Sequence, residues 1–285
     1  MKKTLIAAAF SGIFSLPALT FAADAAPASP HTLTGNLTLT TDYRFRGISQ
    51  TFKKPAIQGG IDYSHASGFY LGNWNSNVNS GAGFPDGNLE MDFYGGYKTS
   101  VGDVGLDIGG IFYYYPGSEA SVLGLGAESG AVSNKEIYIG ATWKFLSVKY
   151  YHSVDDYFSL RGVDSTGTAT GQDTKGSNYL DIGASYDLGN GWGINGHVGH
   201  LNFKNVHNGN YTDWKLGVTK DVNGWVFAAA YIGTDAKGQC TGATSYQPYC
   251  FTNSNSNNGA GGINFGTKTK DAGDDTVVLS VTKAF

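Results

Sequence analysis

The sequence has 285 residues, of which only 15% are charged, and it contains 42 glycines and 18 tyrosines. Many glycines and aromatic residues with few charges are typical of a β-barrel with aromatic girdles and argue against a helical enzyme. The formal net charge of −4 at pH 7 argues against a nucleic-acid-binding protein.

Residues 1–22 are expected to be a secretory signal that is cleaved during export. Lys2 and Lys3 form its charged head, residues 5–16 form its apolar run, and a small-residue cleavage site follows. The apolar run is short and is broken at Pro17, which argues against a membrane-anchoring helix. The mature chain is therefore expected outside the cytoplasm.

Residues 23–32, rich in alanine and proline, are predicted to be a flexible periplasmic lead. Residues 33–285 are predicted to form an all-β fold, a transmembrane up-and-down antiparallel β-barrel. About twelve strands are expected, each near the ~9–11 residues that a tilted membrane strand needs. Their predicted ranges are 33–45, 55–64, 69–78, 89–99, 104–115, 136–145, 147–154, 179–188, 192–201, 211–221, 225–233 and 276–285.

Apolar and polar residues alternate along most of these strands, which gives each strand one apolar face and one polar face. In the first strand the apolar face consists of Leu33, Leu37, Leu39, Tyr43 and Phe45. Tyr43 and Phe45 are expected in an outward aromatic belt near the outer membrane surface. The parity of the third strand is ambiguous. Such strands suit a barrel wall with lipid outside and water inside.

Short and long connections between the predicted strands alternate. The links after strands two, four, six, eight and ten are short, and their Asn-Gly and other glycine pairs favour tight hairpin turns. The other links are longer and polar. This alternation is typical of outer-membrane barrels with short periplasmic turns and long outer loops. It predicts a Gram-negative outer membrane with both chain termini in the periplasm.

One long segment also resembles a known family. It runs from Thr41 through Gly47-Ile48-Ser49-Gln50, Gln58-Gly59-Gly60-Ile61-Asp62-Tyr63 and Gly68-Phe69-Tyr70-Leu71-Gly72 to Trp74. This run resembles the opening block of the TorF family of porins, also called the Gcw_chp domain family. The resemblance covers residues 33–285 in length and layout, but the distinctive residues lie in the first third. It implies an outer-membrane barrel and supplies neither a substrate nor catalytic residues.

Charged residues with inward parity are the candidates for a pore lining that sets ion or solute preference. An alternative interpretation is a barrel plugged by paired charges, with a structural or surface-binding function. Twelve strands lie between barrels filled by side chains and wide porins, which favours a narrow passive channel for small hydrophilic solutes or ions. The candidates are Asp42, Arg44, Asp62, Glu90, Asp92, Lys98, Asp107, Glu136, Lys144, Lys149, Asp181, Asp213 and Lys215.

The expected partners are outer-membrane lipid, lipopolysaccharide, small hydrophilic solutes and the outer-membrane assembly machinery. A basic cluster around the first outer loop is expected either to draw anions or to touch lipopolysaccharide phosphates: Arg44, Arg46, Lys53 and Lys54. Phe285, a terminal aromatic residue on an amphipathic last strand, resembles the signal that the assembly machinery reads. Cys240 and Cys250, in the last long loop of an exported chain, are predicted to form a disulfide.

A lipid-modifying barrel enzyme would need a histidine and a serine on one face near the outer interface. His152 and Ser153 are adjacent and point to opposite faces of a strand, while His65 and Ser67 fall in a predicted periplasmic turn. No catalytic pair is therefore predicted, and no cofactor or metal is expected. The acidic group Asp271, Asp274 and Asp275 offers oxygen ligands for calcium, but a solvated loop is the favoured interpretation.

Overall fold

The computed structural model describes residues 9–11, 13–15, 29–123, 129–258 and 262–285. The predicted signal lies outside the described residues except for β1 (Ala9–Ser11) and β2 (Ile13–Ser15), which pair as a two-stranded sheet. Most of the predicted lead also lies outside them. No helix in the described ranges is long and apolar enough to cross a membrane.

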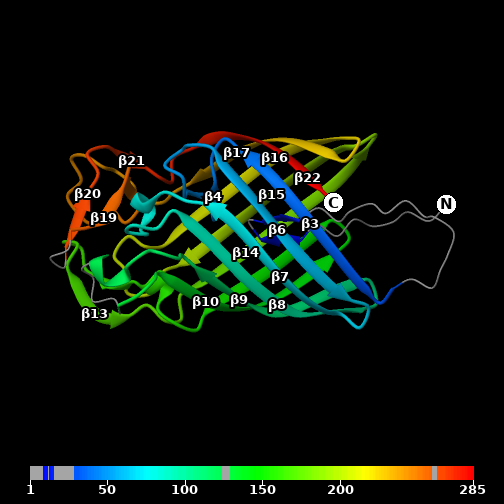
Figure 1. The fold of residues 1–285 in the computed structure, drawn as a ribbon, viewed down its shortest axis with the longest axis horizontal. Coiled ribbons are helices and arrows are strands. Elements are labelled where there is room, and N and C mark those ends of the chain that lie inside the picture. Colours follow the sequence, from blue (N-terminus) through cyan, green and yellow to red (C-terminus); the bar gives the residue numbers. More distant parts are fainter. Residues whose placement is uncertain (1–8, 12, 16–28, 124–128, 259–261) are drawn as a thin grey trace.

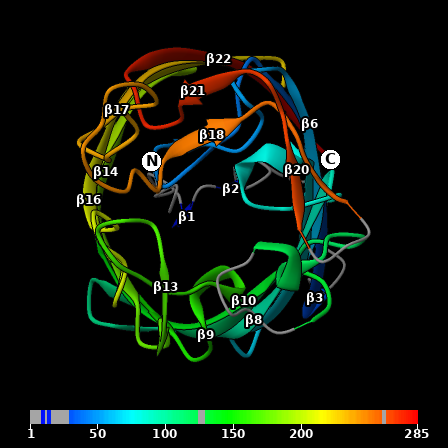
Figure 2. The same ribbon diagram turned by 90° about the vertical axis from the view of Figure 1, so that its left-hand side faces the viewer.

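A closed antiparallel barrel of twelve strands makes up the body of the molecule and confirms the predicted fold class. Figure 1 shows the strands crossing the long axis obliquely, and Figure 2 shows the ring that they form. The barrel strands are β3 (His31–Thr40), β6 (Ala56–His65), β7 (Phe69–Asn77), β8 (Leu89–Val101), β9 (Val104–Tyr114), β10 (Ser133–Trp143), β11 (Leu146–Ser153), β14 (Asn178–Gly189), β15 (Trp192–Asn202), β16 (Tyr211–Val222), β17 (Trp225–Thr234) and β22 (Thr276–Ala284).

The barrel closes where the last strand, β22, pairs with the first, β3. Beyond the strand itself, Phe285 exchanges two backbone hydrogen bonds with Gly35, at 2.7 and 2.9 Å. A Cβ atom on Gly35 would lie 2.6 Å from the Phe285 ring, so the terminal ring covers the outward side of this glycine. The C-terminal residue therefore completes the seam of the barrel.

Short turns connect the strands at one end of the barrel, called here the short-turn end, where the C-terminus also lies (Figure 1). Long loops occupy the opposite, long-loop end. They are named L1 (41–55), L2 (78–88), L3 (115–132), L4 (154–177), L5 (203–210) and L6 (235–275). This arrangement follows the predicted alternation of connections.

The long loops carry small elements of their own, and β18, β20 and β21 of L6 lie within the outline of the ring in Figure 2. The loop elements are β4 (Arg44–Phe45) and β5 (Ile48–Ser49) in L1, η1 (Ser80–Ala82) in L2, η2 (Ala120–Leu123) in L3, η3 (Tyr157–Ser159), β12 (Arg161–Val163) and β13 (Ala169–Asp173) in L4, and β18 (Cys250–Thr252), β19 (Asn255–Asn257), β20 (Ile263–Phe265) and β21 (Thr269–Asp271) in L6.

Apolar side chains cover the outside of the barrel. Leu33, Leu71 and Ile57 are 70%, 64% and 63% exposed, which is unusual for residues that normally fill a core. The ambiguous third strand is resolved because Leu71 faces outward while Trp74 and Ser76 are buried in the interior. An exposed apolar belt of this extent is typical of a surface that another apolar phase covers.

The turn between β16 and β17 is a tight hairpin. Asn223 and Gly224 both have positive φ angles, 54° and 78°, as the twist-compatible two-residue turn requires. Lys220 and Lys283 have outward parity but bend to the short-turn end. Their Nζ atoms donate hydrogen bonds to the carbonyl oxygens of Asn190, at 2.6 Å, and Asn223, at 3.2 Å. Both charges therefore lie at the rim of the apolar belt.

The predicted first strand was too long, and the outward placement of Tyr43 and Phe45 is wrong. β3 ends at Thr40, which pairs with Ala56 at the start of β6, so the β3–β6 ladder stops there. The chain then turns into the barrel, and Tyr43 is buried while Phe45 packs against the interior cluster. The alternation of apolar and polar residues continues past Thr40, although these residues no longer belong to the wall.

Candidate functional site

The candidate site is the barrel lumen, whose long-loop half is occupied by L1. Arg46 of L1 reaches Glu136 on β10, which lies five strands from β3 around the ring. Its Nη1 and Nη2 atoms donate to the two Glu136 carboxylate oxygens at 3.0 and 2.7 Å. Both side chains are buried, and Nη1 also donates to the Tyr157 hydroxyl at 2.9 Å. This bidentate ion pair binds L1 to the opposite wall of the barrel.

Aromatic rings surround the Arg46 guanidinium. Its Cζ atom lies 4.3 Å from the Tyr179 ring centroid, 4.8 Å from that of Phe45 and 5.0 Å from that of Tyr151. Arginine stacks readily on aromatic faces because it is planar and weakly hydrated. The rings exclude water from the ion pair and hold L1 in one position.

The backbone of L1 touches the wall directly at Gly47. The Tyr211 hydroxyl donates to the Arg46 carbonyl oxygen at 2.8 Å. Gly47 has a φ of 79°, and a Cβ atom there would collide with Thr234 and lie 2.7 Å from the Cβ atom of Asp213. Only glycine satisfies both the left-handed backbone and the close approach.

Asp42 and Arg44 form hydrogen bonds that connect parts of L1 to one another and join L1 to L6. Arg44 Nε donates to an Asp42 oxygen at 2.6 Å, and the other Asp42 oxygen accepts from the hydroxyls of Ser49, at 2.7 Å, and Thr51, at 3.0 Å. Arg44 Nη1 donates to the carbonyl oxygen of Ala272 in L6 at 3.0 Å. These two predicted lining residues thus lie in L1 inside the mouth, rather than on a strand of the barrel wall.

Glu90 and Asp92 form an acidic pair on the inward face of β8. Both are buried, and no lysine or arginine among the described residues forms an ion pair with them. Glu90 Oε1 accepts from the Tyr43 hydroxyl at 3.1 Å, while Glu90 Oε2 and Asp92 Oδ1 have no hydrogen-bond partner among the described residues. Burial raises the pKa of the Tyr43 phenol, and the Glu90 charge adds to this rise, so Tyr43 stays a neutral donor.

On the other side of the lumen, His197 lies between two aspartates. Its Nδ1 atom is 3.3 Å from Asp181 Oδ1, and its Nε2 atom is 3.3 Å from Asp213 Oδ2. Asp213 also accepts from the Tyr179 hydroxyl at 2.8 Å. Lys215 follows on the same face of β16 as Asp213. The alternation along the sequence places His197 on the inward face of its strand. It does not indicate that His197 lies between Asp181 and Asp213, two of the predicted lining residues.

The short-turn half of the lumen is polar and less crowded. Asp107 accepts from Lys149 Nζ at 3.0 Å and from the Tyr70 hydroxyl at 2.7 Å. Lys98 Nζ lies 4.5 Å from the Tyr70 ring centroid. Asp107, Lys149 and Tyr70 are only partly buried and Lys98 is exposed, so charged and phenolic groups line this half of the barrel. Asp62 belongs to the same region and accepts from the Tyr94 hydroxyl at 2.5 Å.

Most of the predicted lining residues share the inward faces of the strands, but Lys144 does not. It lies in the turn after β10 with a φ of 55°, is exposed, and places Nζ 4.4 Å from the Trp143 ring centroid. The predicted strand 136–145 runs through this turn, because β10 ends at Trp143. The inward residues are Asp62, Glu90, Asp92, Lys98, Asp107, Glu136, Lys149, Asp181, Asp213 and Lys215.

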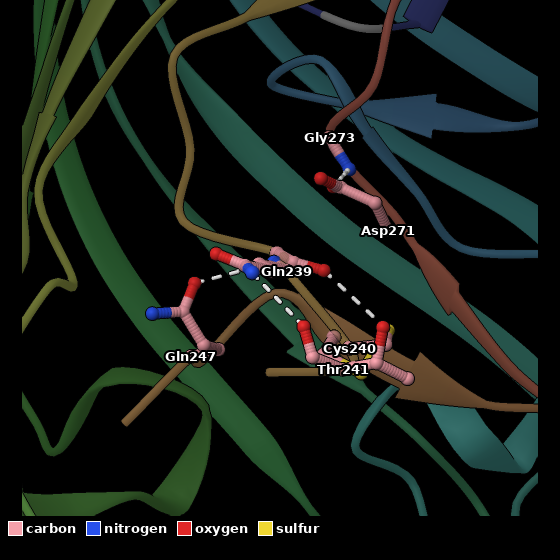
Figure 3. The surroundings of a disulfide bond; sticks show 8 residues. Gln239, Cys240, Thr241, Gln247, Asp271 and Gly273 are labelled. Carbon is pink, nitrogen blue, oxygen red and sulfur yellow. Dashed lines mark hydrogen bonds between the residues drawn. A yellow bond between two sulfur atoms is a disulfide. The ribbon is translucent and has the colours of Figure 1, made fainter. Parts of the chain in front are cut away.

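L6 contains a disulfide between Cys240 and Cys250, whose Cα atoms are 5.2 Å apart (Figure 3). Nearby, Gln239 Nε2 donates to the carbonyl oxygen of Thr241 at 2.9 Å, and Asp271 accepts from the Gly273 N–H at 2.9 Å. The bridge therefore joins the start of β18 to the loop segment that precedes it.

The three loop aspartates do not converge on one point. Asp271 accepts from Gly273, Asp274 forms ion pairs with Lys53 and Arg44, and Asp275 accepts from the Tyr231 hydroxyl. Within the described residues, no group of three or more His, Cys, Asp or Glu side chains could hold a metal ion.

His65 and Ser67 do meet at the short-turn end, where the His65 Nδ1 atom is 2.7 Å from the Ser67 hydroxyl. The same Nδ1 atom accepts from the Ser67 backbone N–H at 3.2 Å; His65 is half-buried and Ser67 is exposed. Because His65 takes part in a local turn, the contact has the form of a side-chain-capped turn. It lies far from the long-loop end at which an outer-interface enzyme would work.

The model of the Gcw_chp family, described as a bacterial protein of unknown function, matches residues 24–285. No curated protein matches the sequence. Solved structures with a similar fold include the KdgM porin, with 8% identity, a TM-score of 0.47 and coverage of 88% of this chain and 99% of that chain. The NanC porin has 8% identity and a TM-score of 0.48, with coverage of 89% of this chain and 98% of that chain. The toluene transporter TodX of P. putida has 10% identity and a TM-score of 0.41, with coverage of 91% of each chain.

Proposed function

We propose that this chain, which belongs to the Gcw_chp family of bacterial proteins, is an outer-membrane channel for small hydrophilic solutes or ions. The observation that carries the proposal is the contrast between the two sides of one closed barrel. The outside is an exposed apolar surface, whereas the inside holds carboxylates, lysines and phenols. A closed barrel leaves no unpaired strand edge, so this wall suits a bilayer with water inside.

Features of the sequence support the location. The resemblance of residues 41–74 to the opening block of TorF-family porins favours a porin-like channel. The predicted signal at residues 1–22 and the terminal Phe285 favour export and insertion by the assembly machinery, with the short-turn end in the periplasm. Lipid and lipopolysaccharide would then surround the apolar belt and the outer loops.

L1 supplies the constriction of the proposed channel. A solute entering from the long-loop end meets the Arg46–Glu136 ion pair and its aromatic cage before it reaches the polar short-turn half. Because charges of both signs line the route, the channel would pass hydrated ions and small neutral solutes by diffusion. Displacement of L1 from Glu136 would widen the route.

A second candidate is a closed barrel with a structural or surface-binding function. It is favoured by the tight packing of the long-loop half, where L1 and rings such as Tyr113, Tyr151 and Tyr179 are buried together. In that case the ion pair would be a permanent brace, and the exposed surfaces of L4 and L6 would carry the function.

Swelling of liposomes that contain the folded mature protein separates the two candidates. A channel predicts swelling in small sugars that stops above a size limit, and the Arg46→Ala variant is expected to raise that limit. Lys135→Ala is a matched control, because Lys135 is next to Glu136 but forms an exposed ion pair with Asp155 at 2.8 Å. A folded barrel that passes no sugar, even as Arg46→Ala, would favour the closed barrel.

A further inference from the structure

Two asparagine side chains lie on the outward face of β7, within the apolar belt. Leu71 is exposed outward and Trp74 is buried inward, so Asn73 and Asn75 share the outward parity. A strand rise of ~3.3 Å per residue at a tilt of ~45° puts them roughly 9 and 14 Å above the level of Phe69. Both levels fall inside an apolar band ~25 Å tall.

The neighbours of these asparagines in the barrel wall are apolar or small. Asn73 is in register with Ile61 on β6 and with Phe93 on β8, which are 58% and 43% exposed. Asn75 is in register with Gly59 and Met91. Gly59 has no side chain, and a Cβ atom there would lie 2.8 Å from the Asn36 carbonyl oxygen, so β3 packs closely against β6 at this point.

The hydrogen bonds of the two amides leave part of Asn75 unused. Asn75 Nδ2 donates to Asn73 Oδ1 at 2.6 Å, and Asn73 Nδ2 donates to the Asp92 carbonyl oxygen at 2.9 Å and, at 3.4 Å, to Asn75 Oδ1. A primary amide has two N–H donors and an oxygen with two lone pairs. Within the described part of the chain, Asn75 therefore keeps one N–H and acceptor capacity on its oxygen, and acyl chains satisfy neither.

We propose that the outward face of β7 is a homodimer interface, with Asn75 facing Asn75 of a second copy across a twofold axis normal to the membrane. The spare N–H and oxygen of one amide match those of an identical amide, and a twofold axis brings the same residues together at the same depth. Gly59, in register with Asn75, projects no side chain toward the second barrel, and small residues are common in membrane interfaces. Exposed Ile61, Leu71 and Phe93 form the apolar rim.

Oxidative cross-linking in isolated outer membranes tests this inference, which rests on the membrane location in the proposed function. Asn75→Cys is expected to give a disulfide-linked dimer, since Cys240 and Cys250 are already joined. Val198→Cys is the matched control. Val198 is an outward residue, 55% exposed, on β15, six strands from β7 around the ring.

A dimer from Asn75→Cys and none from Val198→Cys would support the interface. In addition, Asn75→Leu is expected to shift the detergent-solubilised protein from dimer to monomer in native mass spectrometry, while retaining the heat-dependent gel mobility of a folded barrel. Equal cross-linking of both cysteine variants, a monomeric wild-type protein, or capture of a different protein by Asn75→Cys would overturn the inference. Absence of the folded chain from membranes would instead contradict the proposed location.

Discussion

Arg46 and Gly47 are adjacent residues that fix L1 in the lumen by different means. Arg46 forms an ion pair with Glu136, whereas Gly47 packs closely against Asp213 and Thr234, where there is no room for a side chain. Removing one partner of a buried ion pair typically costs about 3–5 kcal/mol, because the other charge stays buried. The position of the loop therefore depends on two neighbouring residues that can be changed separately.

Replacing Gly47 by alanine is expected to lower the free energy of unfolding by about 1–3 kcal/mol, from backbone strain and a clash with the wall. Denaturant unfolding of the folded barrel, monitored by tryptophan fluorescence, measures this loss. Gly117→Ala is the control, because Gly117 has a φ of 80° but open space around its Cβ position. Equal losses from the two variants would mean that the contact with Asp213 and Thr234 contributes nothing.

The Glu90–Asp92 pair gives the lumen a patch of two buried carboxyl groups that no described ion pair compensates. If the patch is ionised at the pH of the measurement and faces the route of ions, Glu90→Gln together with Asp92→Asn is expected to reduce the preference for cations. The reversal potential in a salt gradient measures this preference. Asp103→Asn, at an exposed position in the β8–β9 turn, is the control and should leave it unchanged. An unchanged potential in the double variant would place the pair away from the ion route.

At the scale of elements, the strands and the loops differ in what determines them. A barrel strand is specified by local alternation, which is why strands such as β6 and β8 were predicted within a few residues. The path of L1 depends on a contact between residues 90 positions apart, Arg46 and Glu136. Nothing local in the sequence indicates whether a loop after Thr40 turns inward or outward.

The disulfide is expected to stabilise L6 and leave the barrel unaffected. Cys240 and Cys250 close a short loop, which contributes about 2–3 kcal/mol to local order. The double substitution to serine should speed protease cleavage within L6 while the heat-dependent gel mobility of the barrel persists. Loss of that mobility would show that L6 is required for the barrel to form.

The seam between β22 and β3 is expected to depend on the last residue. Deleting Phe285 removes two backbone hydrogen bonds to Gly35 and the ring that covers it. The yield of folded protein in outer membranes should fall, and refolding into detergent in vitro should be less affected if Phe285 acts mainly as an assembly signal. Phe265→Ala, which removes an exposed ring in L6, is the control. Normal membrane yield without Phe285 would contradict that part of the account.

For the whole molecule, the sequence predicted the wall better than the interior. The twelve strands, the alternation of connections and the inward side of residues such as Asp107 and Lys149 follow from a period of two. The filling of the long-loop half by L1 does not, because it depends on which distant side chains meet. Lys144 shows the same limit at the end of a strand: β10 ends two residues before the predicted end, and the turn that follows takes the Lys144 side chain out of the lumen.

Single-channel conductance of the folded mature protein in a planar bilayer tests the central claim most directly. The account predicts discrete conductance steps for the wild-type protein, larger steps for Arg46→Ala, whose L1 is no longer tied to Glu136, and unchanged steps for Lys135→Ala. A correctly folded wild-type barrel and a folded Arg46→Ala variant that both give no steps across salts and voltages would contradict it. That result would leave the closed barrel as the function to pursue.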